Sequence, residues 1–281
     1  MSEEKYQHIK IEWPKTKEGG TIDGNYAVIS INRPNKLNSL QVLTLKEIAA
    51  ALDNMDLDPD IRCVALRGTK EIVKKPAFSV GADLSTPLES KVKPNLPVHM
   101  VQSQEYRHKY YDQIERFIKP LIGAIDGYAL GGGLELTLVC DVIIASKRSI
   151  FGFPEIKRGI FPSNGGTQRM AQHIGVARTI NMMYFGEQYT AEQMHDWGYV
   201  THLVDNDKFE DYVHEKVKVL SEAATVSLAM VKKAVRFGTQ APLNIGLQFE
   251  QLGFGITSAS KDVSEGITAF LQKREPKFKG F

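Results

Sequence analysis

The sequence has few of the residues that build disulfide frameworks, metal centres or membrane spans. Its 281 residues include two cysteines, Cys63 and Cys140, and both lie in apolar runs, as buried reduced thiols do in intracellular proteins. The seven histidines show neither an HExxH pattern nor pairing with cysteines at zinc-site spacing. No segment offers the ~18 uncharged residues that a membrane span requires, and the N-terminal residues are charged where a secretory signal would be apolar. We therefore expect a cytoplasmic protein without a metal site, a disulfide or a membrane segment.

The sequence also lacks the strong basic excess of a nucleic-acid-binding protein. Its net charge is +2 and its isoelectric point is near 8.3, so a small anionic ligand is a better expectation than a nucleic acid. The nearest basic run comprises Lys70, Lys74 and Lys75, and Glu71 interrupts it. We interpret this run as a solvated loop. An RNA-binding function is a weaker alternative, since it would need a basic stripe with stacking aromatic residues.

What the sequence does contain is an alternation of β-rich and helical patterns. Strands are predicted at 26–33, 61–69, 120–127 and 141–146, and helices at 41–54, 99–117 and from about 132. This alternation predicts an α/β fold with a parallel sheet. After about residue 165 the strand signal nearly stops, apart from 199–205, and helical patterns continue to residue 271. We divide the chain into an α/β core, 1–205, and a C-terminal helical region, 206–281.

A run of three glycines opens one of the predicted helices, in the segment GYALGGGLELTLVCD at 127–141. The run is not a P-loop, because no Lys-Ser or Lys-Thr follows it, and it lacks the spacing of a dinucleotide fingerprint. One glycine N–H could instead point at an oxygen that becomes negative during a reaction, with Glu135 nearby to move a proton. Read alone, Glu135 is equally an acid in the first turn of a helix, where the helix dipole favours it.

Two further segments could complete such a site. The segment PAFSVGADLS at 76–85 is a Gly-Ala turn that offers a second backbone N–H, although on its own it is only a tight turn that needs Gly81. Glu155 follows a proline that restricts the chain, and alone it reads as a surface residue near a turn. Together with Glu135 it resembles an acid-base pair whose apolar neighbours raise a carboxyl pKa toward neutrality. Residues 86–104 hold three prolines, and we expect a long loop there that borders the site.

Five segments in order resemble the crotonase superfamily, also called the enoyl-CoA hydratase/isomerase family. The resemblance runs from about residue 8 to the C-terminus. The segments are INRPNKLNSL (31–40), AFSVGADLS (77–85), IDGYALGGGLELTLVCD (125–141), FGFPEIKRGIFPSNGGTQR (151–169) and EGITAFLQKREPKFKG (265–280). The resemblance implies a crotonase-like α/β fold, a spiral of repeated ββα units with a C-terminal helical subdomain that trimerises.

In that family the thioester carbonyl of an acyl-CoA lies between two backbone N–H groups. By motif, the resemblance places these at Ala82 and Gly132, makes Glu135 the base that activates water and makes Glu155 the acid that protonates C2. It implies that Lys36, Leu37, Ala82, Asp83, Leu84, Ser85 and Gly132 line the site for the CoA and acyl groups.

Hydratases of the family resemble this chain in keeping both glutamates. The implied reaction is the reversible syn addition of water to a short-chain trans-2-enoyl-CoA, such as crotonyl-CoA, or the dehydration of 3-hydroxypropionyl-CoA. No cofactor is implied beyond the CoA of the substrate, and the implied assembly is a homohexamer, as a dimer of trimers, or a homotrimer. An isomerase, which needs one acid-base residue, and a thioester hydrolase are the alternatives on this fold. Two departures from the family pattern, Ser79–Val80 and Ser163–Asn164, leave the acyl preference open, and Ser163 and Asn164 put polarity near the second glutamate.

Overall fold

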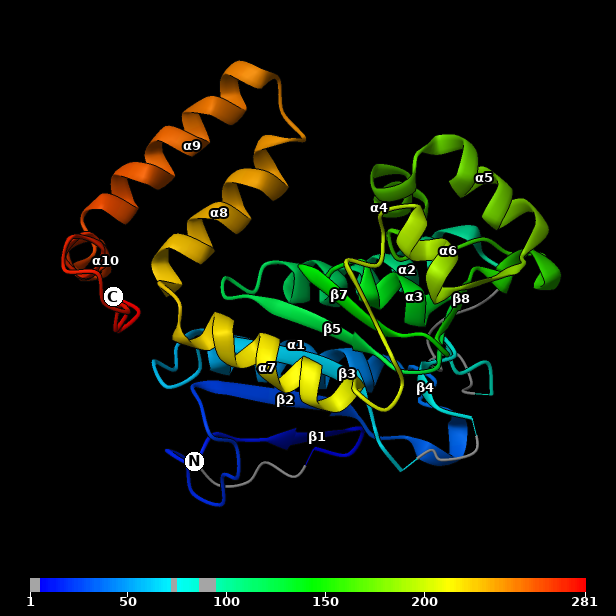
Figure 1. The fold of residues 1–281 in the computed structure, drawn as a ribbon. Coiled ribbons are helices and arrows are strands. Elements are labelled where there is room, and N and C mark those ends of the chain that lie inside the picture. Colours follow the sequence, from blue (N-terminus) through cyan, green and yellow to red (C-terminus); the bar gives the residue numbers. More distant parts are fainter. Residues whose placement is uncertain (1–5, 72–74, 86–94) are drawn as a thin grey trace.

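The computed structural model describes residues 6–71, 75–85 and 95–281, and its centre is a six-stranded sheet (Figure 1). The strand order is β1-β2-β3-β5-β7-β10. All neighbouring strands are parallel except the edge strand β1, which pairs antiparallel with β2. The strands are β1 (Ile9–Glu12), β2 (Tyr26–Ile31), β3 (Cys63–Gly68), β5 (Leu121–Ile125), β7 (Val142–Ser146) and β10 (His202–Val204).

A smaller sheet of four strands lies at the end of the first, in the order β4-β6-β8-β9. Three of its strands directly follow strands β3, β5 and β7 of the larger sheet, so pairs of strands followed by a helix recur along the chain. This recurrence confirms the ββα repeat that the resemblance implied. The strands are β4 (Ala77–Ser79), β6 (Tyr128–Leu130), β8 (Ile150–Gly152) and β9 (Gln188–Thr190).

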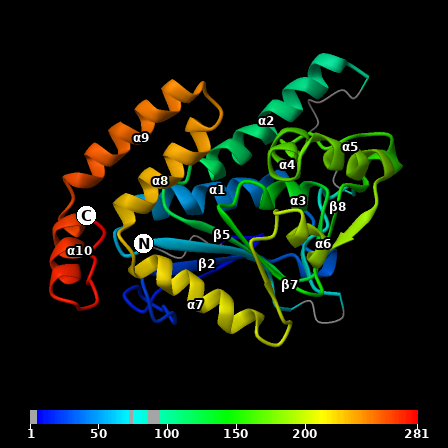
Figure 2. The same ribbon diagram turned by 45° about the horizontal axis from the view of Figure 1, so that its top comes forward.

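Strand β2 shows why the larger sheet carries helices on both faces. All six of its residues are buried, and alternate side chains enter two different cores. Ala27, Ile29 and Ile31 join the core under α1 (Val42–Asp56) and α2 (Pro97–Glu115). Tyr26 and Val28 join the core under α7 (Phe209–Glu222), which lies across the opposite face (Figure 2). Apolar residues at every position thus fit a parallel strand that is covered on both sides.

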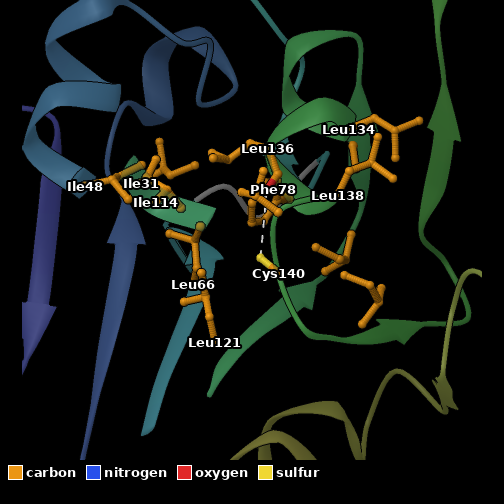
Figure 3. Close-up of a cluster of buried hydrophobic side chains, with 14 of the residues drawn as sticks. Ile31, Ile48, Leu66, Phe78, Ile114, Leu121, Leu134, Leu136, Leu138 and Cys140 are labelled. Carbon is orange, nitrogen blue, oxygen red and sulfur yellow. Dashed lines mark hydrogen bonds between the residues drawn. The ribbon is translucent and has the colours of Figure 1, made fainter. Parts of the chain in front are cut away.

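The glycine run opens α3 (Gly132–Thr137), a short helix whose six residues are all buried. Leu134 and Leu136 pack in the same core as Phe78 and Ile114 (Figure 3). The thiol of Cys140 contacts the Leu136 carbonyl at 3.8 Å, and Cys140, like Cys63, is a free buried cysteine. The core therefore fixes the helix that carries Glu135.

The C-terminal helices lie in two groups. Helices α4 (Gly166–Ile174), α5 (Val176–Phe185) and α6 (Ala191–Asp196) lie beside the smaller sheet, whereas α8 (Thr225–Gly238) and α9 (Leu243–Ser258) form a hairpin that projects from the core (Figure 1). The hairpin closes tightly, since a Cβ added at Gly246 would lie 2.8 Å from the Gly238 carbonyl oxygen. Helix α10 (Lys261–Leu271) follows, and two short 3-10 helices, η1 (Pro34–Lys36) and η2 (Pro154–Arg158), flank the site described below.

The predicted strands and helices of the α/β core are confirmed, with differences at the edges. Strands β1, β4, β6 and β9 were not predicted. The loop expected over 86–104 is wrong from Pro97 onward, because α2 begins there and proline is well tolerated at the first helical position. The rest of that prediction, 86–94, lies outside the described residues. Helix α7 falls in the predicted C-terminal region but packs on the sheet, and the division at 205 and 206 stays a prediction.

Within the described ranges, none of the helices combines the length and the apolar character that crossing a membrane would require.

Candidate active site

Two glycine turns approach each other at the ends of β4 and β6. Gly81 has a φ of +94°, and a Cβ added there would lie 2.8 Å from the Leu130 carbonyl oxygen and 3.1 Å from the Gly132 nitrogen. Only glycine permits this contact between backbones. On the other side of the contact, a Cβ added at Gly132 would have no atom of another element nearer than 3.6 Å, which is its distance from the Ala82 nitrogen. The turns thus place two backbone nitrogens beside the small space that a Gly132 Cβ would fill, where its neighbours lie at ordinary contact distances.

The N–H groups of Ala82 and Gly132 have no hydrogen-bond acceptor among the described residues. Gly132 is the first residue of α3, and the N–H groups of a first helical turn have no partner within the helix. The Tyr111 hydroxyl borders the same space, 3.6 Å from the position of a Gly132 Cβ, and it donates to the Gly132 carbonyl at 3.0 Å. Two free donors and a hydroxyl therefore surround the space over Gly132.

The segment around Lys36 and Leu37 supports the Ala82 turn. Leu40 donates to the Gly81 carbonyl at 2.7 Å and accepts from the Asp83 N–H at 2.9 Å, so it pairs with Ala82 as a single β-bridge. The Val80 N–H donates to the Leu37 carbonyl at 3.2 Å. Lys36, at the end of η1, is exposed. These contacts bring the predicted residues of 36–37 and 82–85 to one edge of the structure.

The carboxylate of Asp83 forms hydrogen bonds within the protein. It accepts from the Ser85 hydroxyl at 2.6 Å, from Arg33 at 2.7 Å and from Gln41 at 3.1 Å. These donors hold the pKa of Asp83 well below its usual range, with Ser85 first and Arg33 second. Leu84, between Asp83 and Ser85, is 68% exposed. Asp83 therefore shapes the turn, and the exposed side chains at this edge include Lys36 and Leu84.

Glu135 is buried, with 1% of its surface exposed, and accepts three hydrogen bonds. The N–H groups of Asn164 and Gly166 donate to Oε1 at 2.7 and 3.0 Å, and the side-chain amide of Asn164 donates to Oε2 at 2.8 Å. Oε2 also borders the open space, 3.9 Å from the position of a Gly132 Cβ. One oxygen of Glu135 is thus held by two backbone N–H groups, and the other, held by the Asn164 side chain, lies near the position that a Gly132 Cβ would take.

Glu155 lies at the second position of η2, directly after Pro154. Its Oε1 lies against Gly131, and its Oε2 is buried without a hydrogen-bond partner in the described part of the chain. The pKa of Glu155 is raised to about 7, mainly by burial and also by the charge of Glu135, against a backbone hydrogen bond that lowers it. The expectation that apolar surroundings bring one carboxyl toward neutrality is met at Glu155. The site thus holds one carboxylate with three donors and one carboxyl that exchanges a proton near neutral pH.

Sequence reasoning missed Tyr111, Gly166 and the role of Asn164. The polarity of Ser163–Asn164 was expected near the second glutamate, but the hydrogen bonds of Asn164 go to the first, Glu135. The Ser163 hydroxyl instead donates to Gln104 of α2 at 3.3 Å. The glycine pair after Asn164 is a sequence signal for a close contact between the backbone and another group. No local pattern marks Tyr111, which lies within a helix.

A partly buried ion network supports the turn that holds Glu135. Arg169 donates to the Asn164 carbonyl at 3.1 Å and to Glu115 at 3.0 and 2.5 Å. Glu115 also accepts from Arg236 of α8 at 2.9 Å, and Arg236 donates to Asp141 at 3.0 Å. Burial opposes the charge of Glu115, yet the hydrogen bonds to its arginines lower its pKa. The network therefore connects the C-terminal hairpin to the Glu135 carboxylate.

A separate cavity of about 240 Å³ does not include these groups. It is lined by charged residues that pair with one another: Arg67 with Glu210 at 2.5 Å, and Arg148 with Asp126. Lys70, from the basic run considered above, pairs with Glu210 at 2.7 Å. Lys74 of that run lies outside the described residues. Among the described residues, no three histidine, cysteine, aspartate or glutamate side chains gather in an arrangement suited to a metal ion.

Comparison with known proteins identifies the family of this chain. The family model described as enoyl-CoA hydratase/isomerase matches residues 21–280. The chain is 34% identical to the 2,3-dehydroadipyl-CoA hydratase of Escherichia coli, over 90% of this chain and 94% of that protein. It is 31% identical to the short-chain-enoyl-CoA hydratase of Clostridium acetobutylicum, over 92% and 95% of the two chains. The crystal structure of an enoyl-CoA hydratase from Bacillus anthracis matches with a TM-score of 0.85 at 30% identity and covers 98% of this chain and 100% of that one.

Proposed function

We propose, from the premise that the chain belongs to the enoyl-CoA hydratase/isomerase family, that it is an enoyl-CoA hydratase. It adds water reversibly, and with syn geometry, to a short-chain trans-2-enoyl-CoA and forms a 3-hydroxyacyl-CoA. The observation that carries the proposal is the pair of carboxyl groups with different surroundings: Glu135 accepts three N–H donors, and burial raises the pKa of Glu155 to about 7. Two carboxyl groups whose environments differ in this way suit one base and one acid.

The thioester oxygen is proposed to accept from the N–H groups of Ala82 and Gly132. Both N–H groups lack a protein acceptor among the described residues, and a Cβ at Gly132 would meet its neighbours only at ordinary contact distances, the nearest at 3.6 Å. The oxygen becomes negative when water adds to C3, and donors already in place stabilise that charge without reorganising. The dipole of α3 acts mainly within the first turn of the helix, and Gly132 lies in that turn, so the dipole also favours negative charge on the oxygen.

Each proton of the proposed reaction has one donor and one acceptor. Glu135 Oε2 takes a proton from water as the water oxygen bonds to C3, and the electrons of the double bond pass to the thioester oxygen as an enolate. The enolate collapses as Glu155 gives its proton to C2. The reverse sequence dehydrates the 3-hydroxyacyl-CoA. The reaction as written needs no cofactor beyond the CoA of the substrate.

The CoA group is proposed to lie along the edge formed by 36–37 and 82–85. Lys36 is an exposed cation there, suited to a phosphate. Leu84 is an exposed apolar side chain beside the Ala82 turn. Leu37 and Asp83 act through the turns that they hold, since the Asp83 carboxylate already has three partners.

A short acyl chain is the finer part of the proposal. It is supported by the likeness to a short-chain-enoyl-CoA hydratase, while the likeness to a 2,3-dehydroadipyl-CoA hydratase marks a different acyl group at similar identity. Initial rates on enoyl-CoAs of increasing chain length, in both directions, test this part. A rate that rises steadily with chain length would contradict it.

The isomerase and the thioester hydrolase remain the alternatives for reaction type. An isomerase needs one acid-base residue, so two carboxyl groups at the site favour the hydratase. The deciding experiment follows crotonyl-CoA by loss of the enoyl absorbance and, in parallel, by release of free thiol. We expect loss of absorbance without thiol. Thiol release without hydration would indicate the hydrolase. The absence of both signals would contradict the proposed function.

A homotrimer, or a hexamer built from two trimers, is proposed as the assembly. The support is the apolar surface of the projecting hairpin and α10, where Leu252, Phe254 and Phe270 are 69%, 72% and 82% exposed. Light scattering of the wild type, Phe254→Asp and a control, Val219→Asp on α7, tests it. We expect smaller particles for Phe254→Asp alone, and a monomeric wild type would contradict the proposal. A cytoplasmic location is proposed as well, supported by the two free, buried cysteines.

A further inference from the structure

Asn164 contributes something to Glu135 that the backbone of its turn does not. The N–H groups of residues 164 and 166 would reach Glu135 Oε1 with almost any side chain at position 164. The contact from Asn164 Nδ2 to Glu135 Oε2, at 2.8 Å, exists only because the side chain is a carboxamide. It acts on the oxygen that borders the open space over Gly132.

The three contacts leave Glu135 with little accepting capacity. A carboxylate oxygen accepts about two hydrogen bonds. Oε1 has two donors, from Asn164 and Gly166, and Oε2 has one, from Asn164. One accepting position is left, on Oε2. A water molecule that is to be deprotonated by Glu135 must bind there, so the Asn164 amide determines from which side it approaches.

The same carboxamide presents an unused acceptor. Asn164 Oδ1 is buried and has no hydrogen-bond partner among the described residues. Its orientation is fixed, because turning the amide over would set Oδ1 against the Glu135 carboxylate and lose the donor. A buried acceptor without a donor is costly, and water is the donor that such positions commonly hold. Because Oδ1 belongs to the same carboxamide whose Nδ2 contacts Glu135 Oε2, it is a second nearby acceptor to which a water could donate.

We infer that Asn164 is a positioning residue for the water that is added, and this inference rests on the proposed hydratase function. Its Nδ2 fixes Glu135 Oε2, and its Oδ1 accepts the hydrogen of the water that Glu135 does not remove. The water is then held at two points, with its oxygen turned toward the substrate. A reacting group displaced by about 1 Å loses up to roughly 10²-fold in rate. Asn164 thus acts through water and Glu135, without contacting the acyl group.

The test compares Asn164→Ala and Asn164→Asp with the wild type on crotonyl-CoA. Alanine keeps both backbone donors to Glu135 and removes the carboxamide, and we expect kcat to fall about 10- to 100-fold with KM nearly unchanged. Aspartate keeps the shape but replaces the amide donor with an acceptor that opposes Glu135. We expect Asn164→Asp to be at least as slow as Asn164→Ala at neutral pH.

Ser163→Ala is the matched control. Ser163 lies on the same turn, and its hydroxyl contacts Gln104 rather than Glu135, so we expect wild-type kcat. Thermal unfolding of each variant separates a loss of rate from a loss of fold.

Four results would overturn the inference. An Asn164→Ala enzyme with wild-type kcat gives the side chain no role in the reaction. Recovery of the rate by Asn164→Asp would show that the shape of the side chain matters and its donor does not. A rise in KM with unchanged kcat would indicate a contact to substrate. If the wild type and Ser163→Ala fail to hydrate any enoyl-CoA, both the proposed function and the inference are wrong. The first three results contradict the inference alone and leave the proposed function unaffected.

Discussion

Glu155 Oε1 occupies the side of Gly131 on which any other residue would carry its Cβ. A Cβ added at Gly131 would lie 2.9 Å from this oxygen, and the φ of Gly131 is +53°. The peptide that opens α3 thus packs directly on the second carboxyl group. Gly131, which precedes the predicted oxyanion donor Gly132, therefore fixes the position of the Glu155 carboxyl group. The glycine run and the segment that contains Glu155 do not show this contact when they are read separately.

Gly131→Ala is expected to impair turnover more than folding. The new methyl group must displace the Glu155 carboxyl, and a reacting group moved by about 1 Å costs roughly 10²-fold in kcat. With φ +53° and ψ −127°, Gly131 lies in a backbone region that other residues rarely adopt, which adds about 1–3 kcal/mol of strain. Steady-state kinetics on crotonyl-CoA measure the first effect, and urea unfolding measures the second.

Gly175→Ala is the control for strain alone, because Gly175 has a φ of +82° and a Cβ there would meet no atom within 4 Å. We expect it to lose stability and keep its kcat. If Gly131→Ala behaves in the same way, the contact with Glu155 has no catalytic weight.

The pH profile of kcat/KM should fall as pH rises through about 7, which is the pKa to which burial raises Glu155. The active form of the pair carries one proton, on Glu155 before hydration and on Glu135 before dehydration. Both forms have the same total number of protons, so the alkaline limb must appear at the same pH in both directions. The measurement is kcat/KM for crotonyl-CoA and for its hydrated product from pH 5 to pH 9.

Binding of acetyl-CoA at each pH controls for titration of the CoA phosphates. A profile that stays level from neutral pH to pH 9 would show that Glu155 is not the acid.

Much of the fold could be predicted because its information is local. The strands of the central sheet are continuous apolar runs, as in β2, where each of six residues is buried. The edge strand β1 has the pattern IKIE with two exposed residues, and β9 has three residues of which one is buried, so neither gives a strong signal. Pro97 was interpreted as part of a loop, but proline also begins helices.

The candidate site divides in the same way. Glycine runs and a glutamate after proline can be recognised in the sequence, and the structure brings them together. The contacts that distinguish the two carboxyl groups span long separations, such as 29 residues between Asn164 and Glu135 and 21 between Tyr111 and Gly132. Such hydrogen bonds follow from packing, and no local pattern contains them.

Arg169→Met is expected to reduce both stability and rate. The arginine side chain is 16% exposed and pairs with Glu115, which would keep only Arg236 as a partner. Breaking a fully buried pair costs about 3–5 kcal/mol, and we expect less here because the pair is partly exposed and Glu115 keeps Arg236. The Asn164 carbonyl also loses its donor, so the turn that holds Glu135 should loosen and kcat should fall. Urea unfolding and kinetics below the unfolding transition measure the two effects.

Lys147→Met is the control, since its ion pair with Asp205 is half exposed on both sides, and we expect little change. Equal stability of Arg169→Met and the wild type would refute a supporting role for the network.

The two glutamates are expected to fail as a unit. Glu135→Gln and Glu155→Gln should each lower kcat by about 10²–10⁴-fold while binding of acetyl-CoA is kept, because each removes one proton transfer and neither removes the N–H groups of Ala82 and Gly132. The double variant should be little slower than the slower single variant, since residues that serve one step do not contribute additively. The measurement is kcat for all four enzymes, with Glu192→Gln on the exposed face of α6 as the control for a lost surface charge.

Near-normal hydration by Glu155→Gln would make Glu155 a structural carboxyl and would favour a member of the family with a single acid-base residue. Multiplying losses in the double variant would instead mean that the two groups contribute independently, and the interpretation of the two glutamates as one unit would be wrong.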